Sequence, residues 1–434
     1  MRKTDRCILY RDFEQGEILA VMTELMEDIT HPKVLSGREG DYFACVHQLV
    51  EMAGAYGFSG NLWHNYLTYL LVNNENAFST ACEIVGPVEG SINAMAAHDF
   101  SIFKELFDFD FSLFEEIYPS LDVRLITDYR NINESSKVFN KRIRDRICQL
   151  ALRLGCAADT KEFMADMVQF YKEFGVGKLG LHKAFRVDGT VTPARIVPIT
   201  NIAHVQLEDL VGYETAKKKL IDNTEAFVHG RKANNVLLFG DSGTGKSTSI
   251  KAIVNQYYDQ GLRMIEIYKH QFKDLSNVIA QIKNRNYRFI IYMDDLSFEE
   301  FEVEYKFLKA VIVGGVETKP ENILIYATSN RRHLIKETWS DRDDVKNENG
   351  MHKSDTMEEK LSLVNRFGVT INYSKPTQKE YFNIVIQLAR KEGITLSDEE
   401  LQKEANKWEL SHGGISGRTA QQFVNYLMGM QGLN

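Results

Sequence analysis

Cysteine is scarce in this chain of 434 residues. All five cysteines lie between Cys7 and Cys156, and no two of them have C-x-x-C spacing. An odd number of dispersed cysteines does not suit a disulfide framework, so we expect buried free thiols. Long apolar runs are also missing, because no stretch approaches the roughly 18 apolar residues of a membrane-spanning helix. The start, MRKTDRCILYRDFEQG, lacks the apolar centre of a signal peptide, which predicts a cytoplasmic protein without a membrane partner.

An excess of basic residues is absent as well. The chain has 52 Lys and Arg against 60 Asp and Glu, a net charge of −8, and an isoelectric point near 5.8. A protein that coats nucleic acid normally shows a basic excess, so the charge gives no support to a nucleic-acid partner beyond a local basic face. The length and an apolar content of 44% suit two to three domains with ordinary cores.

The pattern of apolar residues changes along the chain. Residues 1–185 show apolar spacings of three and four, which predict an all-α N-terminal domain. Residues 186–204 contain Asp-Gly and two prolines, which indicates a linker, with a short hairpin as the alternative. In residues 205–374, short apolar runs alternate with helical stretches, which predicts an α/β core with a parallel sheet covered by helices.

Residues 375–434 return to a helical pattern. Two capping boxes mark helix starts in this region, Thr377 with Glu380 and Ser397 with Glu400. We therefore expect a small helical C-terminal domain after the α/β core.

The stretch VLLFGDSGTGKSTSI, residues 236–250, carries the most specific motif in the chain. It fits G-x-x-x-x-G-K-[ST], the Walker A or phosphate-loop pattern, and lies between an apolar strand and a helical pattern, as that motif requires. The glycines let backbone N–H groups surround a phosphate, and the helix N-terminus adds partial positive charge. The predicted phosphate-binding residues are Gly240, Asp241, Ser242, Gly243, Thr244, Gly245, Lys246, Ser247 and Thr248. Lys246 is expected to reach the outer phosphates, and the Ser247 hydroxyl to bind Mg²⁺.

The stretch FIIYMDDL, residues 289–296, has the form of the second nucleotide motif, Walker B. Its unbroken apolar run is typical of a strand buried on both faces of a parallel sheet, and such sheets bind ligands at their carboxyl ends. Asp294 is expected to hold Mg²⁺, and Asp295 to orient or deprotonate an attacking water. The alternative is that the pair only caps the following helix.

These motifs, followed by ILIYATSN, LVNRFG and GGISGRTA, resemble the AAA+ ATPase superfamily. The stretches LEDLVGYETAKKKL, MIEIYKHQFKDL and SHGGISGRTAQQF are similar to an uncharacterised bacterial family of predicted AAA+ ATPases with a domain of unknown function. The resemblance covers residues 190–434 and is weak before them. It implies a P-loop AAA+ core that binds ATP, with residues 375–434 as a helical lid.

Further site residues follow from the resemblance, motif by motif. Asn330, at the end of ILIYATSN, matches the sensor-one residue that positions the attacking water. Arg366 in NRFG matches the arginine finger that reaches the γ-phosphate of a neighbouring subunit, and Arg418 in GGISGRTA matches the sensor-two arginine of the lid. The segment that flanks the adenine is matched by Leu210, Val211 and Gly212.

The chain departs from the family pattern at two places. The usual Asp-Glu pair is Asp294-Asp295 here, so the second carboxylate lies about 1.5 Å further back unless the backbone compensates. The aromatic–apolar–glycine pore loop of AAA+ unfoldases is replaced by KHQFKDLS, in which Phe272 is the candidate aromatic residue. The first departure bears on the rate of hydrolysis, and the second weakens the case for threading of a polypeptide.

The resemblance and the motifs together predict an enzyme. We expect a homo-oligomer, with a ring as one form, that hydrolyses ATP with Mg²⁺ at an inter-subunit site to remodel or regulate an unidentified protein partner. The alternative is an ATP-gated binding switch, similar to a loader, with negligible turnover. A scaffold whose nucleotide is purely structural is a third reading.

Overall fold

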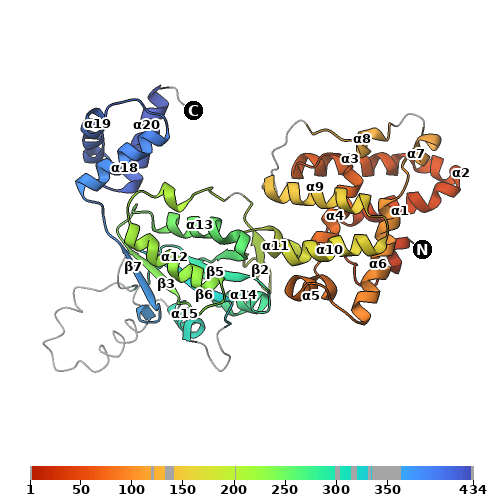
Figure 1. The fold of residues 1–434 in the computed structure, drawn as a ribbon, viewed down its shortest axis with the longest axis horizontal. Coiled ribbons are helices and arrows are strands. Elements are labelled where there is room, and N and C mark those ends of the chain that lie inside the picture. Colours follow the sequence, from red (N-terminus) through yellow and green to blue (C-terminus); the bar gives the residue numbers. More distant parts are fainter. Residues whose placement is uncertain are drawn as a thin grey trace. The chain divides into compact units, whose positions relative to one another are not determined.

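The computed structural model describes residues 2–118, 122–131, 141–200, 202–298, 304–313, 320–330, 334 and 363–431. Contacts within the chain divide it into two compact units, Met1–His182 and Lys183–Asn434 (Figure 1). The first unit ends close to residue 185, where the sequence pattern changes. The predicted core and lid both fall within the second unit.

The first unit is all-α in its described part. Its helices are α1 (Glu17–Glu27), α2 (Pro32–Leu35), α3 (Glu39–Tyr56), α4 (Leu62–Asn73), α5 (Ala77–Val85), α6 (Ser91–Phe107), α7 (Ser112–Ile117), α8 (Arg124–Thr127), α9 (Lys141–Cys156), α10 (Thr160–Phe174) and α11 (Gly177–Leu181). Trp63 is fully buried at the centre, and its indole N–H donates to the Leu106 carbonyl at 2.9 Å. Nowhere in the described ranges is a helix both long enough and apolar enough to cross a bilayer.

The second unit is built on a seven-stranded sheet. The strands are β1 (Ala184–Asp188), β2 (Arg195–Pro198), β3 (Val236–Gly240), β4 (Leu262–Glu266), β5 (Arg288–Met293), β6 (Ile323–Ser329) and β7 (Val369–Tyr373). Their order is β2-β1-β4-β5-β6-β3-β7, and every neighbouring pair is parallel except β1 and β2. The sheet places β3, which precedes the phosphate loop, between β6 and β7. The predicted fold class, a P-loop AAA+ α/β core, is confirmed.

Part of the segment predicted as a linker or short hairpin, residues 186–204, lies in the sheet. Residues 184–188 and 195–198 form an antiparallel pair, and β1 also pairs in parallel with β4. The segment therefore extends the sheet, as the alternative reading of a short hairpin anticipates. Two β-branched residues of these strands are buried, Val187 at 4% exposure and Ile196 at 1%, and such burial favours strands over a free linker.

Helices cover both faces of the sheet (Figure 1). One face packs on α12 (Glu214–Val228) and α13 (Lys246–Tyr257), in a core that takes alternate strand residues such as Val236, Leu238 and Tyr292. The described residues of this part also form α14 (Leu275–Ile282) and α15 (Glu304–Val313). Because both faces are buried, the strands read as continuous apolar runs in the sequence.

Up to residue 431, where the described part ends, three helices follow the sheet and form the lid. They are α18 (Gln378–Lys391), α19 (Asp398–Ser411) and α20 (Gly417–Gln431). Both predicted capping boxes are present, with Thr377 and Ser397 each accepting from the backbone N–H three residues on. The three helices share a core of their own around Tyr381, Leu401 and Phe423.

At Gly240, the last residue of β3, the start of the phosphate loop packs closely against β7. Its φ is +137°, and a Cβ atom there would lie 2.2 Å from the Tyr373 carbonyl oxygen of β7. Gly261 also has a positive φ, +91°, but a Cβ atom there would meet no atom within 4 Å. An alanine at position 261 would therefore strain only the backbone, whereas an alanine at position 240 would also clash with β7.

We expect Gly240→Ala to destabilise the second unit more than Gly261→Ala does. Both substitutions force alanine into a left-handed conformation, at about 1–2 kcal/mol. Only Gly240→Ala also places a Cβ atom against the Tyr373 backbone, which costs roughly 1–3 kcal/mol more. Urea unfolding of the wild type and both variants measures the loss in free energy of unfolding. Equal losses in the two variants would show that β3 and β7 move apart at little cost.

Candidate nucleotide site

The phosphate loop links β3 to α13 through a run of left-handed glycines. Gly243 and Gly245 have φ values of +75° and +94°, conformations that side-chain-bearing residues seldom adopt. The Thr244 hydroxyl donates to the Asp241 carbonyl at 2.8 Å and braces the turn. The loop therefore ends at the N-terminus of a twelve-residue helix, which is a ready anion-binding position.

Lys246, the first residue of α13, is held inside the loop. Its ammonium group donates to the carbonyls of Gly240 and Asp241 at 2.9 and 2.6 Å and to the Asn330 side-chain oxygen at 3.0 Å. The residue is only 7% exposed. Burial lowers the pKa of Lys246, and the nearby carboxylates of Asp241, Asp295 and Asp294 oppose that shift.

Two hydroxyl groups hold Asp294 at the end of β5. Its Oδ1 atom accepts from the Ser247 hydroxyl at 2.7 Å and from the Thr328 hydroxyl at 2.6 Å. Burial tends to raise the pKa of Asp294, but the polar groups around it, Thr328 first, more than offset burial and lower that pKa. The carboxyl group is therefore kept ionised, next to a serine oxygen.

Asp295 turns out of the strand. Its φ is +48°, a left-handed conformation, and its backbone N–H donates to the Thr328 hydroxyl at 2.9 Å. Its carboxylate accepts from the Asn330 side-chain amide at 2.8 Å. Because Asn330 also accepts from Lys246, the side chains of these three residues form one hydrogen-bonded chain across the carboxyl ends of the strands.

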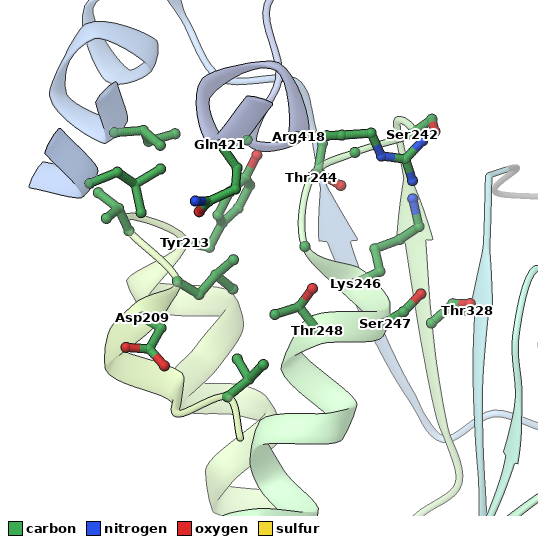
Figure 2. Close-up of a pocket in the computed structure, with 18 of the residues that line it drawn as sticks. Asp209, Tyr213, Ser242, Thr244, Lys246, Ser247, Thr248, Thr328, Arg418 and Gln421 are labelled. Carbon is green, nitrogen blue, oxygen red and sulfur yellow. The ribbon is translucent and has the colours of Figure 1, made fainter. Parts of the chain in front are cut away.

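The lid completes the phosphate end of the site. The backbone N–H of Arg418, near the start of α20, donates to the Gly243 carbonyl at 3.1 Å. Figure 2 shows the Arg418 guanidinium beside Lys246 and Ser242. Arg418 contributes to the lowered pKa of Lys246, since two like charges lie close together. Paired cations at a helix N-terminus favour a polyanion.

A cavity of about 800 Å³ extends from the phosphate loop to an apolar end (Figure 2). Its apolar lining comes from the core and from the α18 helix of the lid: Val205, Leu210, Val211, Ile384 and Leu388. Lys391 of α18 forms an ion pair with Asp209 of the core at this end. One cavity thus combines a cationic end with an apolar end, and both the core and the lid line it.

The structure brings most of the predicted residues to this cavity. Those that line it are Leu210, Val211, Ser242, Gly243, Thr244, Gly245, Lys246, Ser247, Thr248, Asp294, Asp295, Asn330 and Arg418. Gly212, Gly240 and Asp241 belong to the same two segments but do not line it. Arg366 is separate, being exposed in the turn before β7.

The structure also adds residues that the sequence reading missed. Thr328 contacts both aspartates. The available signal was its place two residues before Asn330, which directly follows β6, since alternate residues of an extended segment share a face. Ile384 and Leu388 share a helix face, but their sequence spacing does not say whether that face meets the lid core or a ligand.

Phe272, the candidate pore aromatic, is 1% exposed and packs edge-on against Phe298, so it is not a pore residue in this chain.

Known proteins from two organisms are similar to parts of this chain. A 51-residue segment is 43% identical to the Replication factor C large subunit of Methanococcus vannielii, and covers 12% of this chain and 10% of that protein. A solved structure of a Thermotoga maritima RuvB mutant aligns at 17% identity and a TM-score of 0.38, over 52% of this chain and 65% of that one. The structure of the Thermotoga maritima RuvB Holliday junction branch migration motor aligns at 16% identity and a TM-score of 0.33, over 52% of this chain and 71% of that one.

A family model matches residues 181–431, which is more than half of the chain and nearly the whole of the second unit. The range contains the phosphate loop, both aspartates, Asn330, Arg366 and Arg418. The motifs resemble an uncharacterised AAA+ family with a domain of unknown function, and the family match confirms this expectation. The chain belongs to the family described as Protein of unknown function (DUF815).

Proposed function

We propose that the protein binds ATP with Mg²⁺ in this cavity and hydrolyses it at a site completed by a neighbouring subunit. The observation that carries the proposal is the hydrogen-bonded chain of Lys246, Asn330 and Asp295, which lies beside the Ser247–Asp294 pair and under Arg418. Phosphoryl transfer requires positioning and charge neutralisation, and these residues supply both. The apolar end, with Leu210, has the character that suits a base.

The residues present fit a magnesium ion. Ser247 Oγ and Asp294 Oδ1 lie 2.7 Å apart, and hydroxyl and carboxylate oxygens are ligands that Mg²⁺ prefers, alongside phosphate oxygens. A Mg²⁺ ion held by Ser247 and Asp294 would neutralise negative charge on the phosphates. Lys246 of the core and Arg418 of the lid neutralise the remaining negative charge of the phosphates. Asp295 accepts a hydrogen bond from an attacking water, and Asn330 holds Asp295 in place.

Arg366 is assigned to the neighbouring subunit's site. It is exposed and does not line the cavity of its own chain, which supports a role across an interface. A homo-oligomer, with a ring as one form, follows from that assignment. We further propose that turnover remodels or regulates a protein partner selected by the helical N-terminal unit.

An ATP-gated binding switch with negligible turnover is the second candidate. Two contacts favour it, the ion pair of Lys391 with Asp209 and the hydrogen bond from Arg418 to Gly243, because both join the lid to the core at the cavity. A nucleotide with different affinity for two lid positions would shift their populations. Slow hydrolysis is the only feature that separates this candidate from the first.

Steady-state ATP hydrolysis tests the proposal directly. We expect the rate per subunit to rise and then level off over about a thousandfold range of protein concentration, because assembly completes the site. Lys246→Ala is expected to weaken ATP binding by about 10–100-fold, since it removes a charged partner of the phosphates. A wild-type rate equal to that of Lys246→Ala at every concentration, with ATP still bound, would refute hydrolysis and leave the switch.

A further inference from the structure

A single buried hydroxyl joins the two adjacent aspartates of the site. Thr328 lies on β6 and is 1% exposed. Its Oγ1 donates to Asp294 Oδ1 at 2.6 Å and accepts from the Asp295 backbone N–H at 2.9 Å. A hydroxyl group can donate and accept at once, which a methyl group of the same size cannot.

The register of the sheet fixes this arrangement. β5 and β6 are parallel with Met293 opposite Ala327, so Asp294, the first residue after β5, lies beside Thr328, which is still paired with Leu238 of β3. The Leu296 N–H donates to the Thr328 carbonyl at 2.7 Å and continues the contact past the strand end. Thr328 is therefore held by the backbone on both sides of the aspartates.

The bond from Asp295 stabilises an unfavourable backbone. A left-handed conformation costs a residue with a side chain roughly 1–2 kcal/mol, and the φ of Asp295 is +48°. The hydrogen bond to Thr328 secures the N–H in that conformation. The same conformation brings the Asp295 carboxylate to the Asn330 amide. Thr328 thus controls the direction of Asp295 through the backbone.

The bond to Asp294 has a different consequence. Ser247 and Thr328 both donate to Oδ1 of Asp294. In the proposed function the Ser247 oxygen binds the metal, and Thr328 keeps its 2.6 Å hydrogen bond to the carboxylate and orients it. Groups that hydrogen-bond to metal-binding carboxylates commonly change metal affinity when they are removed.

We propose that Thr328 is a positioning residue that sets both the metal affinity of Asp294 and the water-orienting direction of Asp295. This assignment rests on the proposed function, because it concerns the same site. It gives one residue two measurable effects, one on metal binding and one on the rate at saturating metal. Thr328 also lines the cavity, and in this proposal it acts through the two aspartates.

Thr328→Val tests the assignment because it keeps the shape of the side chain and removes both hydrogen bonds. We expect Mn²⁺ affinity of the protein–ATP complex, measured by electron paramagnetic resonance, to fall by about 10–100-fold. ATP affinity in EDTA should stay within about twofold of the wild type, since the phosphate loop is intact. The hydrolysis rate at saturating metal should also fall, and Thr328→Ser should restore both properties.

Thr224→Val is the matched control. Thr224 is also fully buried, and its hydroxyl bonds to the Leu220 carbonyl at 2.8 Å and the Tyr326 hydroxyl at 2.7 Å. It lies on α12 and does not line the cavity. We expect this variant to lose stability without any change in Mn²⁺ affinity.

Two results would overturn the role of Thr328. One is unchanged Mn²⁺ affinity in Thr328→Val, and the other is an equal loss of ATP affinity in EDTA, which would indicate a general support of the pocket. A wild-type protein that binds no ATP would instead overturn the proposed function, and the role of Thr328 with it. Measuring the wild type first therefore separates the two failures.

Discussion

Arg366→Ala is expected to lower ATP turnover by about a thousandfold while ATP affinity stays close to that of the wild type. An arginine that stabilises the transferring phosphate typically contributes this much to the rate. Arg366 is exposed and lies away from the cavity of its own chain. Its loss should therefore spare nucleotide binding in the same subunit and damage the site of the neighbour.

Mixed assemblies give this prediction its decisive measurement. Arg366→Ala subunits keep an intact cavity, whereas Lys246→Ala subunits keep an intact Arg366. We expect a mixture of the two inactive variants to recover activity, because each lesion spares one half of a composite site. Arg231→Ala, which removes another exposed arginine of the same unit, should keep the wild-type rate. No recovery at any mixing ratio would contradict the assignment across an interface.

Asp295→Asn is expected to lower turnover by about 100–1,000-fold and to leave ATP binding intact. An amide cannot accept a proton from the attacking water, and loss of a positioned general base costs this much. Steady-state rates and ATP affinity, measured on the same preparation, distinguish a loss of turnover from a loss of ATP binding. Asp222→Asn, an exposed substitution on α12, is the matched control and should change neither. A variant with the wild-type rate would remove Asp295 from the mechanism.

Asp295→Glu decides whether the shorter side chain limits the rate. The left-handed backbone and the 2.8 Å bond to Asn330 fit an aspartate, so the backbone supplies part of the reach that a glutamate would otherwise provide. We expect the longer side chain to break that bond and lower the rate, since misplacement by about 1 Å costs up to 100-fold. A faster Asp295→Glu variant would show that the aspartate is too short.

The sequence alone was sufficient for the local features of the site. The phosphate loop, the strand that ends in Asp294 and Asp295, and both capping boxes are encoded within short segments, so their patterns can be read directly. Asn330 and Arg418 came from motif resemblance, and the structure brings both to the cavity with Lys246. Their roles in catalysis stay predictions.

Local pattern was not sufficient where partners are far apart in the chain. Residues 186–204 carry turn signals that suit a linker, yet part of the segment joins the sheet, because β1 pairs with β4 and β2 pairs with β1. Phe272 resembled a pore aromatic because of its position after a strand, but burial against Phe298 decides its environment. Exposure depends on which elements pack together, and periodicity within one segment does not contain that information.

What the sequence determined by itself is the fold class, the phosphate loop and the identity of the acidic pair. Only the tertiary structure decided how that pair is held, because the hydroxyl that joins the aspartates lies 34 residues away from Asp294 in the chain. The left-handed turn at Asp295 and the bond to Asn330 likewise depend on the register between β5 and β6. Strand register is set by the packing of the whole sheet, so the geometry of a site at the strand ends is a tertiary property.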